Sequence, residues 1–295
     1  MKFFLSVFIL IFQIAVRAEE PDLQPEDQVS KPAQEALVPE KESPPPTSSK
    51  PLNIKAGATL QNYRYEEPGL ISHTGVLIGA WLNWGYEVPY YKGTIQSEIN
   101  TGHIDYDGAL CDVNSGDCVD YKSKTTELII RISHRLGIDV TETFQVFAGL
   151  GYRYLYDKGE GVGFYRRIGD YWIVPLGFTT SVMWEELNTK VIFDYEFDYF
   201  LSGQMQSKLS DVNSTYSDVK HPQNRGRAQR ITVGFEPQPE VDTPHPWMFY
   251  FFYENWSIPQ SDRAELLING SRSGKFFYEP ENRSNAYGLR VGLSY

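Results

Sequence analysis

Hydrophobic and polar side chains alternate along the last eleven residues of the chain, 285–295. One parity carries Tyr287, Leu289, Val291, Leu293 and Tyr295, and the other carries small residues and Arg290. Successive side chains of a β-strand point to opposite faces. The pattern therefore predicts a strand with one apolar and one polar face, as is found between lipid and the interior of a barrel.

The same alternation recurs along much of the chain from about residue 60. It is clearest in 126–136, 144–156 and 189–201, whereas 247–256 is so aromatic on both parities that its faces stay unassigned. Such runs predict about ten strands. They lie near 58–67, 73–87, 91–104, 122–137, 142–156, 165–180, 188–202, 226–237, 246–257 and 285–295. An even number of strands suits a closed antiparallel barrel with both ends on one side of a membrane.

The strands of soluble barrels and secreted β-sandwiches also alternate between apolar and polar residues. Three features favour a membrane barrel, in which the apolar parity faces lipid. The strands run about ten residues or more, the length that a tilted transmembrane strand needs. Aromatic residues crowd the predicted strand ends, as girdles do at the membrane interfaces. The final strand also ends on an aromatic residue. The predicted fold is an all-β, closed antiparallel transmembrane barrel in the bacterial outer membrane.

The predicted connections differ in length on the two sides of this barrel. If the first strand starts in the periplasm, the short turns at 137–139, 185–187 and 237–246 are periplasmic. The long polar segments 103–121, 203–225 and 258–284 are then extracellular loops. Short periplasmic turns and long outer loops are typical of outer-membrane barrels.

The beginning of the chain predicts an export signal followed by a disordered segment. Lys2 precedes an apolar run that ends in a small-x-small cleavage pattern at Ala18, and the run is too short to cross a bilayer. Residues 19–55 hold eight of the 18 prolines and no aromatic residue, so they bury too little apolar surface to order. We therefore expect a signal peptide at 1–18, a disordered acidic Pro-rich segment at 19–55 and the barrel at 56–295.

Charge and cysteine content narrow the chemistry further. The formal net charge of −11 argues against a nucleic-acid partner, which would need a basic face. Cys111 and Cys118 are the only cysteines, and their close spacing in an exported chain predicts a local loop disulfide. This loop offers too few ligands for a metal site, and we expect neither a metal nor a cofactor.

The parity opposite the apolar one collects charged residues that would line the lumen. They are Glu127, Arg131, Arg135, Arg153, Lys190, Asp194, Glu196, Asp198, Arg230 and Arg290. Buried charges need partners, so we expect cross-lumen Arg–carboxylate pairs that fill and rigidify the barrel. Arg290 is expected to meet Asp194, Glu196 or an acid of a neighbouring strand. The alternatives are an ion or small-solute path and a catalytic carboxylate site. Asp194, Glu196 and Asp198 share one face and suit a divalent cation, although the opposing arginines favour ion pairing.

Four blocks resemble recurring segments of a family of uncharacterised bacterial outer-membrane β-barrel proteins. They are Tyr-Arg-Tyr-Glu-Glu-Pro at 63–68, Val-Pro-Leu-Gly at 174–177, Asp-Tyr-Phe-Leu-Ser-Gly at 198–203 and Gly-Leu-Arg at 288–290. This resemblance implies fold and location, with no known activity. The final strand also resembles those read by the barrel-assembly machinery, although Phe is commoner than Tyr as the last residue. The implied partners are outer-membrane lipid, lipopolysaccharide and that machinery.

More remotely, the layout of about ten strands with long outer loops resembles the omptins, which are outer-membrane endopeptidases. Their site pairs an Asp-x-Asp in the second outer loop with an Asp-x-His in the fourth, and would hold a water between carboxylates and a His base. Here the second outer loop holds Asp105 and Asp107, and the fourth holds Asp218 and His221. The last two are three residues apart instead of two, which on a strand would turn one of them to the opposite face.

The leading hypothesis is a non-enzymatic outer-membrane barrel that displays long extracellular loops for surface binding, adhesion or envelope integrity, because loops on rigid scaffolds commonly carry recognition. The alternatives are an omptin-like endopeptidase and a narrow, porin-like ion or small-solute channel. The sequence shows no GxSxG elbow, HExxH helix or phosphate-binding glycine loop. It therefore leaves the enzyme question open and favours no catalytic activity.

Overall fold

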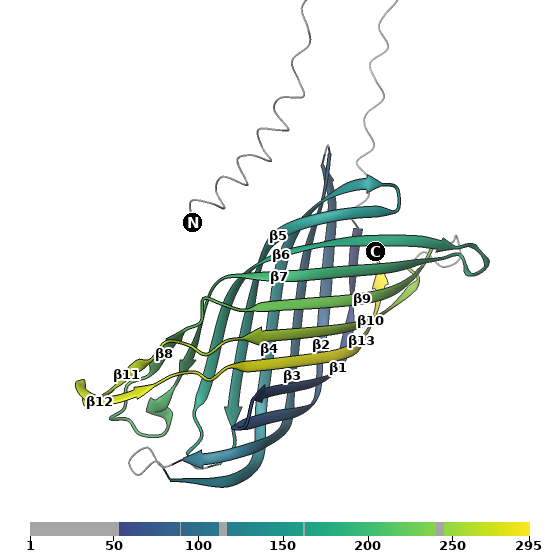
Figure 1. Cartoon of the computed structure of the whole chain (residues 1–295). Coiled ribbons are helices and arrows are strands. Elements are labelled where there is room, and N and C mark those ends of the chain that lie inside the picture. Colours follow the sequence, from purple (N-terminus) through teal and green to yellow (C-terminus); the bar gives the residue numbers. More distant parts are fainter. Residues whose placement is uncertain (1–52, 89, 112–116, 162, 240–244) are drawn as a thin grey trace, which may run out of the picture. The chain divides into compact units, whose positions relative to one another are not determined.

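A computed structural model describes residues 53–88, 90–111, 117–161, 163–239 and 245–295 (Figure 1). They belong to one compact unit, Ser49–Tyr295. The predicted signal peptide, residues 19–52 of the predicted Pro-rich segment and the side chain of Cys111 lie outside the described part. No helix within the described ranges is long and apolar enough to cross a membrane.

Ten long strands of the described residues close into an antiparallel barrel (Figure 1). In order around the barrel they are β1 (Asn53–Glu67), β2 (Ile71–Val88), β3 (Tyr91–Cys111), β4 (Cys118–Thr141), β5 (Phe144–Gly159), β6 (Arg166–Trp184), β7 (Thr189–Ser207), β9 (Arg227–Pro237), β10 (Trp247–Ile258) and β13 (Asn282–Ser294). Three short strands, β8 (Val219–Pro222), β11 (Ala264–Ile268) and β12 (Ser271–Phe277), extend one end. The predicted fold and even strand count are confirmed.

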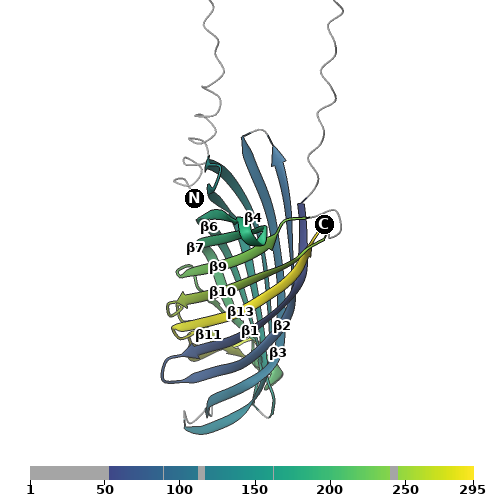
Figure 2. The same ribbon diagram turned by 90° about the vertical axis from the view of Figure 1, so that its right-hand side faces the viewer.

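The first and last barrel strands pair with each other and close the sheet. β13 lies between β1 and β10 (Figure 2). Its ladder with β1 runs from Lys55 opposite Ser294 to Glu66 opposite Arg283. Closure removes the unpaired edges that an open sheet would present to lipid, where backbone groups have no water to bond.

The outward face of the barrel is apolar, as the alternation predicts. The side chains of Ile78, Phe251 and Tyr287 are 61%, 56% and 60% exposed, whereas Leu77, which precedes Ile78 on the opposite parity of β2, is fully buried. A soluble monomer rarely exposes so much contiguous apolar surface, so lipid is the medium that covers it. The chain is therefore a bacterial outer-membrane β-barrel, and Tyr287 to Tyr295 lie on its lipid-facing parity.

The structure also assigns the faces of β10, which is aromatic on both parities. Trp247, Phe249 and Phe251 point outward, whereas Met248, Tyr250, Phe252, Glu254 and Trp256 are buried in the lumen. The sequence hides this division because aromatic side chains fill both the lipid face and the interior.

Several predicted boundaries are wrong because the strands are longer than the transmembrane span. Residues 137–139, expected as a turn, continue the ladder of β4 with β5, and the turn lies at 142–143. Residues 53–55, expected in the disordered segment, belong to β1. The expected outer loop 103–121 consists largely of paired extensions of β3 and β4. By contrast, the expected turn at 185–187 is a short 3₁₀ turn, Glu185–Leu187.

The lumen is filled in layers that follow the strands from the end that carries Asn53 and Tyr295 to the opposite, outer end. Trp81, Met248 and Tyr250 form a small apolar cluster. A layer of charged residues follows, and then a larger apolar cluster that contains Leu77, Ile173, Phe200 and Trp256. A second charged layer lies beyond it near the outer ends of the strands. Connections at the outer end are the longer ones, so this end is extracellular by the usual asymmetry of outer-membrane barrels.

Candidate functional site

Arg131 of β4 is the centre of the first charged layer. Its guanidinium group donates to Glu196 and to Asp198 of β7, the latter at 2.9 Å, and to Glu254 of β10 at 3.1 Å. β7 and β10 lie three and five strands away from β4 around the barrel, so these bonds cross the lumen.

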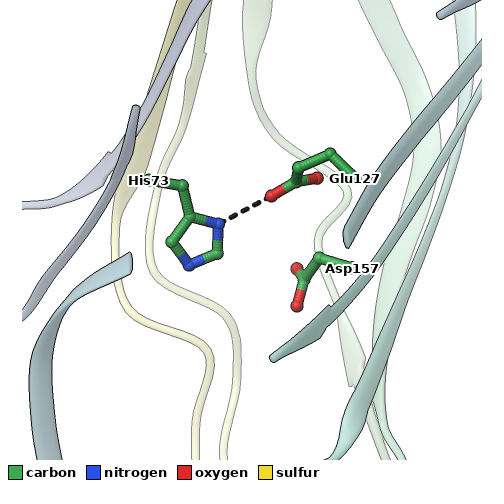
Figure 3. Close-up of side chains that lie close together, drawn as sticks. All are labelled: His73, Glu127 and Asp157. Atoms are coloured by element: carbon green, nitrogen blue, oxygen red, sulfur yellow. Dashed lines mark hydrogen bonds and ion pairs between the residues drawn. The ribbon is translucent and has the colours of Figure 1, made fainter. Parts of the chain in front are cut away.

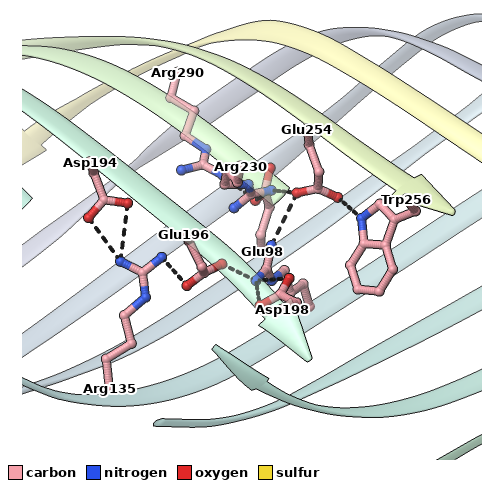
Figure 4. A network of polar contacts seen from close by, with 10 residues as sticks. Glu98, Arg135, Asp194, Glu196, Asp198, Arg230, Glu254, Trp256 and Arg290 are labelled. Carbon is pink, nitrogen blue, oxygen red and sulfur yellow. Dashed lines mark hydrogen bonds and ion pairs between the residues drawn. The ribbon is translucent and has the colours of Figure 1, made fainter. Parts of the chain in front are cut away.

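The remaining arginines of this layer share the same acids. Arg135 contacts Asp194 at 3.2 Å and also Glu196. Arg230 contacts Glu254 at 2.5 Å and Glu98 at 3.0 Å, and Arg290 contacts the same Glu98 oxygen. We call this set the lumen network: Glu98, Arg131, Arg135, Asp194, Glu196, Asp198, Arg230, Glu254 and Arg290 (Figure 4).

Five carboxyl groups and four guanidinium groups make the lumen network nearly neutral. The packing is tight, since the cavity beside Arg131, Glu98 and Glu254 has a volume of only about 10 Å³. That is about the room of one water molecule. The lumen network therefore fills most of the middle of the barrel with paired side chains.

Three residues expected among the lumen charges lie outside this network. Arg153 stacks on Trp256, with its guanidinium carbon 4.4 Å from the ring centroid. Glu127 belongs to the second charged layer, where its Oε1 lies 2.6 Å from Nδ1 of His73. Lys190, also expected in the lumen, is exposed near the periplasmic turn. The parity of these residues follows the prediction, but their depth along the barrel decides their partners.

The second charged layer holds a compact group of possible ligands, His73 of β2, Glu127 of β4 and Asp157 of β5. One ligand atom of each lies within 4.8 Å of the others, and all three residues are buried. Their side chains point toward one another (Figure 3). Among the described residues this is the one group of three or more His, Cys, Asp or Glu residues that meets this criterion. We call it the His73 cluster.

Arg167 of β6 lies beside the His73 cluster and holds three acids. It contacts Glu67 at 2.7 Å, Asp157 at 3.6 Å and Glu279, which lies between β12 and β13. Burial raises the pKa of the Glu279 carboxyl to about 7, although Arg167 acts in the opposite direction. Tyr65 donates to Glu67 and accepts from Arg167, so its hydroxyl joins the same group.

Beyond this layer, two outer segments pack on each other to form an ordered extension. Leu209 and Val219, from the segment after β7, share a small buried core with Leu266 of β11. Backbone bonds join the two segments, from Ser217 N to Leu267 O at 2.9 Å and from Asn269 N to Thr215 O at 2.8 Å. We call residues 208–222 and 264–277 together the outer platform.

The four residues that the omptin resemblance singles out face different surroundings. Asp105 and Asp107 are exposed on the outward face of β3, where they pair with Lys124 and, at 2.8 Å, with Lys122. Asp218 accepts from Lys208 at 2.9 Å and from Ser210 at 2.6 Å. These three carboxyl groups are thus held by neighbours of their own loops.

His221 differs from these three acids because it is buried. It lies opposite Met205 in the β7–β8 ladder, and its Nδ1 has no hydrogen-bond partner. Burial, with a smaller contribution from the charge of Arg167, lowers the pKa of His221 to about 4. The spacing of three residues places Asp218 and His221 on opposite faces.

Cys111 and Cys118 face each other as cross-strand partners at the outer end of the β3–β4 ladder. The Cys111 side chain is outside the described residues, so the disulfide stays a prediction.

Sequence reasoning missed several residues of both charged layers. Glu98 lies on the polar parity of a predicted strand, and Asp157 follows directly after the predicted strand 142–156 with the same parity as Arg153. Their parity was available as a signal. Glu254 was hidden by the ambiguous faces of β10, and Glu279 lies in an outer segment whose folding back onto the lumen has no sequence signal.

No protein-family model matches the chain, and no curated protein matches it. Among solved structures it is similar to the outer membrane protease OmpT from Escherichia coli, with a TM-score of 0.53 and 10% sequence identity over 84% of this chain and 97% of OmpT. It is also similar to the translocator domain of the autotransporter NalP from Neisseria meningitidis, with a TM-score of 0.40 and 10% identity over 83% of this chain and 88% of that one. At such identities the likeness to OmpT supports the barrel fold and does not extend to its activity.

Proposed function

We propose that this protein is a closed, non-enzymatic outer-membrane barrel that displays the outer platform for binding at the cell surface. The observation that carries the proposal is the blocked lumen below an ordered outer extension. A barrel that transports solutes needs a continuous path, and a surface-binding barrel needs a rigid base for its recognition segments.

The lumen network argues against a solute path. Arg131 alone bonds to three carboxylates that come from two other strands. Removing these charges from water costs free energy, and the ion pairs between them compensate for that cost. A solute path through the network could open only if several of these ion pairs broke together. Apolar layers lie above and below the lumen network and close the barrel further.

The outer platform supports binding because it is packed and presents large side chains. Leu266 is fully buried within the platform, whereas Phe276 on the platform and Tyr278 next to it are 54% and 45% exposed. Preordered segments lose little entropy on binding, and exposed aromatic side chains are favoured at interfaces. The expected contacts with lipopolysaccharide and the barrel-assembly machinery remain part of this proposal.

The omptin-like alternative has weaker support. Asp105 and Asp107 are engaged by lysines on the outward face of the barrel, and Asp218 by Lys208. A general base must reach the proton that it removes, and a water between these acids and the buried His221 would first require their release.

Three measurements on one preparation test the proposal. The folded protein in a planar bilayer should give no stepwise conductance, and in detergent with lipopolysaccharide it should not cleave basic peptides. Bacteria that express it should attach to immobilised extracellular-matrix protein more strongly than cells with the empty vector. Conductance steps would establish a channel instead, and cleavage that disappears in Asp107→Ala would establish a peptidase.

A matched pair of variants ties attachment to the platform. Replacing residues 264–277 by a short Gly-Ser linker should abolish the excess attachment and leave the heat-modifiable mobility of the folded barrel unchanged. Lys122→Ala, which changes an exposed residue on the side of the barrel, should attach like the wild type. Equal attachment of the linker variant and the wild type would refute a binding role for the platform.

A further inference from the structure

The His73 cluster carries more negative charge than its surroundings neutralise. Four carboxyl groups, those of Glu67, Glu127, Asp157 and Glu279, face two guanidinium groups, those of Arg153 and Arg167. If all are ionised, the outer layer has an excess of two negative charges. The lumen network, by contrast, is balanced to within one charge. Unbalanced buried charge is costly and requires either protons or a bound cation.

One carboxylate of the cluster is also incompletely bonded. Oε2 of Glu127 is buried and has no hydrogen-bond partner, although the residue is only 1% exposed. Its other oxygen, Oε1, lies against Nδ1 of His73. Buried carboxylate oxygens are normally bonded, so an unpartnered oxygen on a carboxyl group that lies beside a histidine and a second carboxyl group points to a missing ligand.

We propose that the His73 cluster binds one divalent transition-metal ion of the Zn²⁺ class through His73, Glu127 and Asp157. A single divalent cation would cancel the excess of two charges and satisfy Glu127 Oε2. One imidazole nitrogen with two carboxylate oxygens is a donor set that suits Zn²⁺, whereas Ca²⁺ and Mg²⁺ prefer oxygen ligands alone.

The surroundings fit a structural metal site. The ring of His73 lies between those of Tyr65 and Tyr106, with centroids 5.2 Å and 5.4 Å away. These contacts fix the imidazole, and Arg167 holds Asp157 from outside the cluster. The three ligands come from β2, β4 and β5, so the ion would tie together strands at the outer end of the barrel. This role is independent of the proposed surface binding.

Metal titration of the folded barrel in detergent tests the proposal. Because the cluster is buried, the protein is refolded after chelator treatment, both with and without one equivalent of Zn²⁺ or Co²⁺. Wild type is expected to retain one equivalent after gel filtration. Co²⁺ should give the visible absorption of a low-coordinate site, and X-ray absorption of the Zn²⁺ form should show one imidazole ligand.

The variants His73→Asn, Glu127→Gln and Asp157→Asn should each bind Zn²⁺ at least 100-fold more weakly. His134→Asn is the matched control, because this histidine lies on the same strand as Glu127 but bonds to Tyr86 on the outward face. It should bind like the wild type. Heat-modifiable mobility verifies that each variant is folded.

Three results would overturn the proposal. They are a wild-type protein that retains no metal, retention that is lost equally in His134→Asn, and a Zn²⁺ absorption spectrum without imidazole. The last measurement uses wild type alone, so it decides the matter even if the ligand variants do not fold. In the first case, two protons neutralise the excess charge instead of a cation.

Discussion

Arg290 of the last strand forms an ion pair with Glu98 of β3 inside the barrel. Arg230 of β9 contacts the same carboxylate oxygen at 3.0 Å. The sequence predicts correctly that Arg290 faces the lumen. The expected partner is Asp194, Glu196 or an acid of a neighbouring strand, and this part of the prediction is wrong because β3 is not a neighbour of β13. The pair links the closing strand β13 to β3, which lies three strands away around the barrel, so this charge pair contributes to closing the barrel as well as to filling its lumen.

Loss of the central arginine is expected to destabilise the barrel strongly. Arg131→Met removes one cation from three buried carboxylates, and breaking a buried pair in this way costs about 3–5 kcal/mol. Urea unfolding in detergent measures the loss. Lys124→Met is the control, since it breaks a pair with Asp105 in which both side chains are more than half exposed, which costs about 0–1 kcal/mol. Similar losses for both variants would contradict a structural role for the lumen network.

A methyl group at the closing seam is expected to weaken the barrel. A Cβ at Gly57 would lie 1.9 Å from the backbone oxygen of Val291 on β13, so Gly57→Ala should cost about 1–3 kcal/mol by overpacking. Gly85→Ala is a matched change at a glycine of β2, where the nearest atoms are 3.5 Å away. It should leave the urea midpoint within error of the wild type or slightly raise it. The prediction fails if both variants unfold alike.

Acid is expected to weaken the outer platform through His221. The pKa of this residue is lowered to about 4 in the folded protein, so the unfolded chain binds a proton first as the pH falls below about 6.5. The stability that the neutral, buried His221 contributes to the platform is therefore present at neutral pH and is lost as the pH falls toward 4. Between pH 7 and pH 5 the loss is on the order of 2 kcal/mol.

The measurement compares wild type with His221→Gln, which does not titrate. Protease sensitivity of the platform is recorded at both pH values, and the wild type should become relatively more sensitive at pH 5. A difference between the two proteins that is the same at both pH values would show that His221 does not titrate as expected.

The platform core is expected to be separable from the barrel. Leu266 is fully buried in the small cluster with Leu209 and Val219, and Leu266→Ala should cost about 2–5 kcal/mol locally. Limited proteolysis should then cut within 208–222 or 264–277, while the barrel keeps its folded electrophoretic mobility. Val212→Ala, at an exposed position in the other segment of the platform, should leave the cleavage pattern unchanged. Unfolding of the whole barrel by Leu266→Ala would show that platform and barrel form one cooperative unit.

The sequence alone determined the properties that depend on a period of two. Alternation put Tyr287 to Tyr295 on one face and residues such as Arg131, Glu196 and Arg290 on the other, because neighbouring side chains of a strand must face opposite ways. Strand length and the aromatic strand ends then assigned the apolar face to lipid. The alternation also predicted about ten strands, an even number that suits a closed barrel. Where both parities are aromatic, as in β10, the same rule could not distinguish lipid from interior.

Only the tertiary structure decided which charges meet. Strand register and tilt set the depth of each residue in the lumen, so they bring Arg290 to Glu98 and Glu127 to His73, although 192 and 54 residues separate these pairs. Outer segments that fold back add Glu279, whose position no local pattern specifies. Ion pairing and any metal site depend on these three-dimensional distances, whereas parity specifies only the face on which each residue lies.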